Sequence, residues 1–166
     1  MTRRHWRRQR GSSVLYVVVL SPILLLSIAL ATEAGGLQMQ KQRVRSAVDQ
    51  SVVVAASAAS HAGRAAQLDS ARAAAVLRDV LTANLSPLAS AFAGATPQSM
   101  ARDADVAVIT NTPAPDPFDH TVLVRQPSLE VRVRVPLHTG LFAVAGLPST
   151  VTVTLVAAAA LRETGT

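Results

Sequence analysis

The chain has 166 residues, enough for one small domain beside a membrane segment, and it contains no cysteine. The lack of cysteine excludes disulfides, thiolate catalysis, lipobox attachment and cysteine-based zinc sites. The formal charge of +6 comes almost entirely from five N-terminal arginines, since residues 11–166 hold 11 basic and 10 acidic side chains. We therefore expect no nucleic-acid-binding surface, which needs a basic stripe with interleaved aromatic residues.

A charge-free segment of 21 residues lies between Gly11 and Glu33. At about 1.5 Å of rise per residue, this segment matches the hydrocarbon core of a bilayer, about 30 Å thick. It predicts a transmembrane helix over residues 13–34. The residues assigned to the membrane anchor are Val14, Leu15, Tyr16, Leu20, Pro22, Leu24, Leu25, Leu26, Ile28 and Leu30.

The basic residues ahead of this segment predict its orientation. Residues 1–12 carry the five arginines of the topology signal, Arg3, Arg4, Arg7, Arg8 and Arg10. The basic cluster behind the segment is weaker and lies further from the membrane edge. Because arginine-rich flanks stay in the cytoplasm, we expect the N-terminus inside the cell and the rest of the chain outside.

A cleaved secretory signal is the alternative interpretation. A basic start, an apolar core and small residues at Ala29 and Ala31 imitate its three parts. The apolar core is longer than the usual 7–15 residues of a signal peptide, which favours an uncut anchor. Cleavage near Ala31 would instead release a soluble exported domain.

Helical periodicity continues over residues 35–85. Leu37, Val44, Val48, Ser51 and Ala55 recur at steps of three and four, and no proline separates them from the membrane segment. We expect one long helix with a soft point at Gly35 and Gly36, ending near Gly63. A second helix is expected from about Ala66 until Ser86 and Pro87 end it.

The remaining chain is predicted as a linker over 86–103 followed by a small antiparallel sheet over 104–166. Strands are expected over 105–110, 121–125, 128–135 and 150–156, with a loop at 112–118 and a short helix within 137–148. In the clearest strand, Leu129, Val131, Val133 and Val135 alternate with Glu130, Arg132 and Arg134. The predicted fold class is therefore α+β.

The order of these features resembles the TadE/TadG-type proteins of tight-adherence (Flp) pilus systems. The resemblance rests on Arg10–Ser12, the apolar run to Thr32, Glu33–Leu37, Gln42–Gln50 and the alanine-rich Val54–Ala59. In the C-terminal half it rests on Val131–Pro136, Leu141, Phe142, Gly146–Pro148 and the closing residues from Val151. The glutamate at position 33 stands where this family usually has aspartate.

The resemblance implies a pilin-like accessory component of pilus assembly in the bacterial inner membrane, with a periplasmic or extracellular domain. Its partners would be the membrane and other pilus or pilin subunits, in a homo- or hetero-oligomer. Longer TadG proteins carry a von Willebrand A domain with Asp-x-Ser-x-Ser. The nearest string here, Asp49–Val53, lacks the second serine.

Prepilin-type cleavage at Gly11 is a further hypothesis, although Tyr16 occupies the place of the glutamate usual in such substrates.

No catalytic motif, cofactor motif or small-molecule site is apparent in the sequence, so we expect a protein that is not an enzyme. Asp116, Asp119 and His120 have metal-binding chemistry, but carboxylates in such proline-rich loops commonly serve turns. Glu33 either ends the span in the hydrated interface or pairs with a partner helix. Ala55 and Ala59 fit either a close contact with another subunit or the core of this chain.

Overall fold

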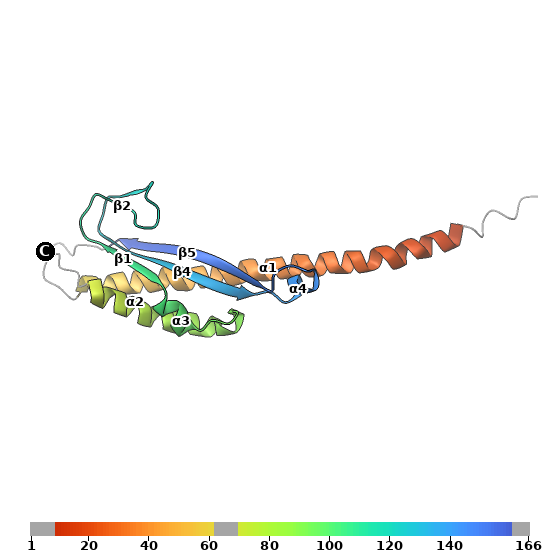
Figure 1. Ribbon diagram of the computed structural model, residues 1–166, viewed down its shortest axis with the longest axis horizontal. Helices are drawn as coiled ribbons and strands as arrows, with labels where there is room; N and C mark the ends of the chain where they lie inside the picture. Colours follow the sequence, from red (N-terminus) through yellow and green to blue (C-terminus); the bar gives the residue numbers. More distant parts are fainter. Residues whose placement is uncertain (1–8, 62–69, 161–166) are drawn as a thin grey trace, which may run out of the picture. The chain divides into compact units, whose positions relative to one another are not determined.

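The computed structural model describes residues 9–61 and 70–160. It confirms the α+β class: one long apolar helix is followed by shorter helices and a small antiparallel sheet (Figure 1). The chain divides into two compact units. The first unit comprises Met1–Gln38 and Thr139–Ser149, and the second comprises Met39–His138 and Thr150–Thr166.

Helix α1 spans Gln9–His61 without interruption, and Pro22 lies inside it. The expected continuation of the membrane segment into one long helix is therefore confirmed through Gly35 and Gly36. Neither glycine has another atom within 4 Å of the position that a Cβ would occupy. The predicted helix end at Gly63 and the start near Ala66 lie outside the described residues.

The second unit is built around a three-stranded antiparallel sheet in the order β1–β4–β5. Strand β1 is Asp105–Ile109, β4 is Ser128–His138 and β5 is Thr150–Ala160. Strands β4 and β5 pair over their whole length, from Ser128 opposite Ala160 to His138 opposite Thr150. Both strands are longer than the alternating sequence alone indicated.

The core of this unit follows the predicted periodicities. One face of β4 is fully buried, and its residues are Leu129, Val131, Val133, Val135 and Leu137. The part of α1 that belongs to the second unit buries Val44, Val48, Ser51, Val52 and Ala55. Helix α2 (Ser70–Leu85) buries Ala73, Leu77, Leu81 and Leu85. Asn84 Nδ2 donates to Ser51 Oγ over 2.9 Å. This hydrogen bond joins α2 to α1, in addition to the buried apolar side chains of the two helices.

Residues 86–103, expected as a linker, contain two short helices. Helix α2 ends at Leu85 as predicted, and Ser86–Ala91 then forms the 3₁₀ helix η1. Helix α3 (Pro97–Arg102) begins with a capping box in which the side chains of Thr96 and Ser99 bond each other's backbone N–H. Between the two helices, Ala93 N donates to the carbonyl oxygen of Pro136, which attaches this stretch to β4.

The loop between β1 and β4 carries a two-stranded ribbon of β2 (Ala114–Pro115) and β3 (Leu123–Val124). Arg132, which lies opposite Asp105, donates from Nη2 to its Oδ2 over 2.9 Å. The Arg132 guanidinium also lies 4.9 Å from the centre of the Phe118 ring. This arginine therefore connects the loop to the sheet, and its side chain stays 35% exposed, on the face that the alternation predicted for solvent.

Candidate functional site

The N-terminal part of α1 exposes apolar side chains around its whole circumference. Among the predicted anchor residues with described side chains, seven aliphatic or aromatic ones are exposed: Val14, Tyr16, Leu20, Leu24, Leu25, Leu26 and Ile28. Pro22 is also exposed, Leu30 is half-buried, and the side chain of Leu15 is outside the described set. A helix that is apolar on all sides needs lipid or protein around it.

Within the described residues this is the one helix long and apolar enough to cross a membrane. A signal sequence near an N-terminus meets the same criterion of length and composition. Two of its hydroxyl groups bond within the helix: Ser27 Oγ donates to the carbonyl of Ile23 over 2.8 Å, and Thr32 Oγ1 to that of Ile28 over 2.9 Å. Because both hydroxyl groups donate within the helix, they need no water as a hydrogen-bond partner, and the segment is compatible with the hydrocarbon core of a bilayer.

The predicted topology signal lies largely beyond the described residues. Arg3, Arg4, Arg7 and Arg8 lie outside them. Arg10 and Gly11 lie in the first turn of α1, without described side chains. The hypothesis of cleavage at Gly11 therefore stays a prediction from sequence.

Glu33, the first charged residue after the apolar run, makes a contact that neither sequence interpretation included. Its Oε1 accepts a hydrogen bond of 2.8 Å from the backbone N–H of Leu141, 108 residues further along the chain. Its Oε2 is buried and has no hydrogen-bond partner. Leu141 begins the short helix α4 (Leu141–Val144) in the loop between β4 and β5, and this loop belongs to the same compact unit as Glu33.

Of the two alanines proposed as partner contacts, Ala55 is fully buried within the second unit. It packs in the core of this chain and is not available to another subunit. The side chain of Ala59 is outside the described set. Val53 and Val54, next to Ala55, are both exposed, and they provide the apolar surface on this part of α1.

The cluster of Asp116, Asp119 and His120 is organised by turn hydrogen bonds. Asp116 Oδ1 accepts from the backbone N–H groups of Phe118 (2.6 Å) and Asp119 (3.0 Å). Asp119 Oδ1 accepts from the hydroxyl and the backbone N–H of Thr121, which lower the pKa of the Asp119 carboxyl. The structure gathers no set of three metal-ligating side chains in the parts of the chain that it describes.

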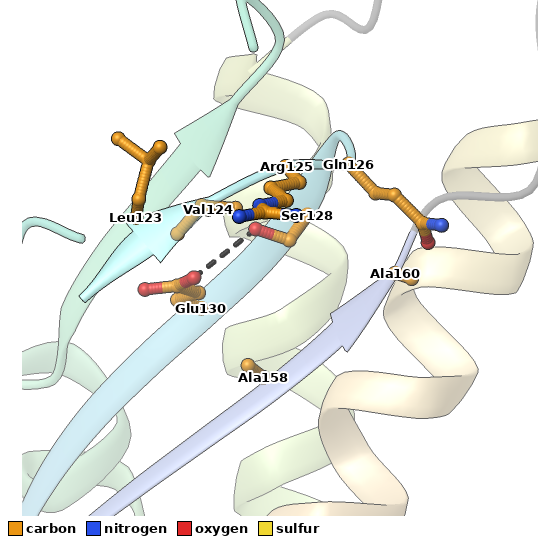
Figure 2. Close-up of a pocket in the computed structure, with 8 residues that line it drawn as sticks. All are labelled: Leu123, Val124, Arg125, Gln126, Ser128, Glu130, Ala158 and Ala160. Atoms are coloured by element: carbon orange, nitrogen blue, oxygen red, sulfur yellow. Dashed lines mark hydrogen bonds between the residues drawn. The ribbon is translucent and has the colours of Figure 1, made fainter. Parts of the chain in front are cut away.

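Glu130 is a buried carboxyl that the alternating pattern had predicted to face solvent. It is only 3% exposed, and Leu123 and Val124 of β3 lie beside it. Figure 2 shows its carboxylate turned toward Ser128, whose hydroxyl donates to Glu130 Oε1 over 3.1 Å. Glu130 Oε2 is buried without a partner. A shallow depression lined by Leu123, Val124, Arg125, Gln126, Ser128, Glu130, Ala158 and Ala160 lies beside it.

Burial raises the pKa of Glu130 above its ordinary value of 4.5. The Ser128 hydrogen bond opposes this, whereas the negative charge of the neighbouring Asp116 carboxylate adds to it. The depression is therefore a place where protonation affects stability.

We expect Glu130→Gln to stabilise the protein at pH 7 by about 1 kcal/mol or more, and to change stability little near pH 4. A raised folded-state pKa contributes stability that is complete below the unfolded value and is lost as pH rises through the folded value. Glutamine retains the neutral form throughout. Urea unfolding of the detergent-solubilised chain across this pH range measures the difference. Asp79→Asn, on an exposed position of α2, is the control, and an equal gain at both pH values would contradict the prediction.

Comparisons with protein-family models, curated proteins and solved structures give no match for this chain. The resemblance of the sequence to TadE/TadG-type proteins therefore stays a prediction. What the geometry supplies independently is an exposed apolar helix, a packed α+β unit on the same helix, and a loop bonded to Glu33.

Proposed function

We propose that this chain is a single-pass, pilin-like accessory subunit of Tad/Flp-type pilus assembly in the bacterial inner membrane. The observation that carries the proposal is helix α1, which is exposed and apolar before Glu33 and packed into a folded core after Gln40. A subunit that acts by helix packing needs this combination. The N-terminus would be cytoplasmic, and the C-terminal unit periplasmic or extracellular.

The proposed activity is structural, without turnover, cofactor or small-molecule substrate. Its partners would be other pilus or pilin subunits, which contact α1 beyond the membrane. Val53 and Val54 are the favoured contact residues, because they are exposed valines between fully buried Val52 and Ala55. Together they form a small exposed apolar surface on the folded part of α1, which a partner subunit would cover.

Affinity capture of the tagged full-length chain from detergent-solubilised membranes tests this function. Wild-type protein is expected to retain pilus assembly subunits, and Val53→Arg with Val54→Arg is expected to retain several-fold less, because two charges replace the apolar contact. Both proteins should accumulate equally. Capture of no pilus subunit by the wild type would contradict the proposal.

The mass of the captured chain distinguishes the alternative of a soluble exported domain. An intact N-terminus, or one beginning at Ser12, is expected for an anchored subunit. A mature chain beginning at Thr32 would mean that the apolar segment is a removed signal, and the protein would then be a soluble binding domain.

A further inference from the structure

The loop between β4 and β5 is an apolar element associated with the end of the charge-free segment. Thr139–Ser149 forms one compact unit with the N-terminal part of α1, apart from the strands that it joins. The N–H of Leu141 donates to Glu33 Oε1 over 2.8 Å, and Gly140 lies beside the same oxygen. The loop is thereby fixed at the residue where the apolar run of α1 ends.

Three large apolar side chains of this loop are exposed. Val144 is 76% exposed, Leu147 51% and Leu141 43%. The sequence has no Asp, Glu, Lys or Arg from residue 135 to residue 161, so no charge opposes transfer of the loop to an apolar environment. Three such side chains on one short loop are costly to hydrate, at roughly 25 cal/mol for each Å² of apolar surface.

The backbone of the loop is closed on itself. Thr139 N donates to the carbonyl of Ser149 over 2.9 Å, and Thr139 Oγ1 donates to that of Pro148 over 2.8 Å. Leu147 N donates to the carbonyl of Phe142 over 2.8 Å, and Gly146 adopts the positive φ of 75° that this turn requires. A loop with internally bonded backbone groups loses less on leaving water than an open one.

The depth of the loop follows from helix α1. Glu33 lies one residue beyond the charge-free segment, so it marks the interface between hydrocarbon and water for a helix that spans the bilayer. Ala29, Leu30 and Leu37 lie on the same face as Glu33 and are half-buried, whereas most residues of this segment are exposed. The shielded face reaches about one helical turn, or roughly 5 Å, into the charge-free segment.

We propose that the β4–β5 loop inserts Leu141, Val144 and Leu147 into the interfacial layer of the bilayer that α1 spans. The occupant of this surface is lipid, since the loop is bonded to the helix at the boundary of the span. The proposal rests on the proposed anchoring function. It adds a second membrane contact, which would fix the rotation of α1 and prevent the first unit from tilting freely.

Because the native chain has no cysteine, single cysteines can report the depth of individual residues. An environment-sensitive NBD fluorophore is attached to Val144→Cys, or in a second variant to Leu147→Cys, in full-length protein reconstituted into vesicles of phosphatidylethanolamine and phosphatidylglycerol. Matched controls are Leu24→Cys, within the span, and Val122→Cys, an exposed valine in the second unit. Quenching by aqueous iodide is compared with quenching by nitroxide lipids.

Both loop labels are expected to show blue-shifted emission and several-fold weaker iodide quenching than the label at position 122. They should be quenched more strongly by a nitroxide near the headgroups than by one near the acyl-chain ends, and the label at position 24 should show the reverse preference. If both loop labels respond to iodide as position 122 does while position 24 is protected, the loop proposal is wrong and the anchor stands. If position 24 is itself open to iodide, the anchoring function fails as well.

Discussion

Leu20→Arg combined with Leu24→Arg is expected to abolish stable insertion of this chain into membranes. The two positions flank the middle of the charge-free segment, and both side chains are exposed on α1. Arginine at the centre of a spanning helix costs about 2.5–3.5 kcal/mol on insertion scales, and each replaced leucine removes a favourable contribution. The two arginines alone should therefore cost about 5–7 kcal/mol, enough to reverse insertion of a single segment.

Flotation of the membranes in a density gradient after an alkaline wash measures the effect, because it separates inserted protein from aggregates. Wild type should float with lipid, and the arginine pair should remain at the bottom or be degraded. Val53→Arg with Val54→Arg adds the same charge to an exposed part of the same helix and should still float. Flotation of the Leu20→Arg, Leu24→Arg variant at wild-type levels would refute the assignment of this segment as the anchor.

Periodicity was sufficient to predict the elements of this fold that depend on local pattern. Alternation from Leu129 to Val135 predicted β4 and its buried face, and steps of three and four predicted the buried face of α1. Ser86 and Pro87 marked the end of α2 correctly. In each of these cases neighbouring residues carry the signal, because side-chain direction repeats with the backbone.

Features that depend on distant segments could not be predicted in this way. Glu130 continues the alternation of β4, yet it is buried beside residues of the loop between β1 and β4. The contacts of Arg132 with Phe118 and Asp105 likewise depend on segments distant in the sequence. The contact of Glu33 with Leu141 joins residues 108 positions apart, so no pattern within either segment indicates it.

The short helix α3 is a different case, since its signal was present in the sequence. Thr96 and Ser99 have the spacing of a capping box, and Pro97 occupies the first helical position, where proline is favoured. The apolar residues around them are small and lack a clear period, which led to the prediction of a linker over 86–103. Capping residues therefore carried more information than periodicity in this stretch.

The proposed anchor would place Glu33 at the membrane boundary, where a carboxylate is costly unless a donor compensates it. The backbone N–H of Leu141 supplies such a donor to Oε1 from within the chain, whereas Oε2 is buried without a partner. Under the proposed function, we expect contacts with other subunits through the second unit, where Val53 and Val54 are exposed.

Leu81→Ala is expected to have the largest effect on the stability of the second unit, lowering its free energy of unfolding by about 2–5 kcal/mol. Leu81 is fully buried on α2, one turn from Leu77 and Leu85, and α1 contributes mainly valine and alanine to the core. The side chains around Leu81 are themselves packed in the core, so the cavity left by the substitution closes only in part. Loss of 2 kcal/mol would lower the midpoint of thermal unfolding by about 10 °C in a domain of this size.

Circular dichroism of the detergent-solubilised chain during heating measures the change, because the sheet and α2 unfold while the membrane segment stays in the micelle. Leu123→Ala is the matched control: the same atoms are removed from a leucine that is 53% exposed, and a change below about 0.5 kcal/mol is expected. Equal destabilisation by the two substitutions would contradict the burial of Leu81 in the core. A large loss at position 81 alone would locate the stability of the second unit in the leucine face of α2.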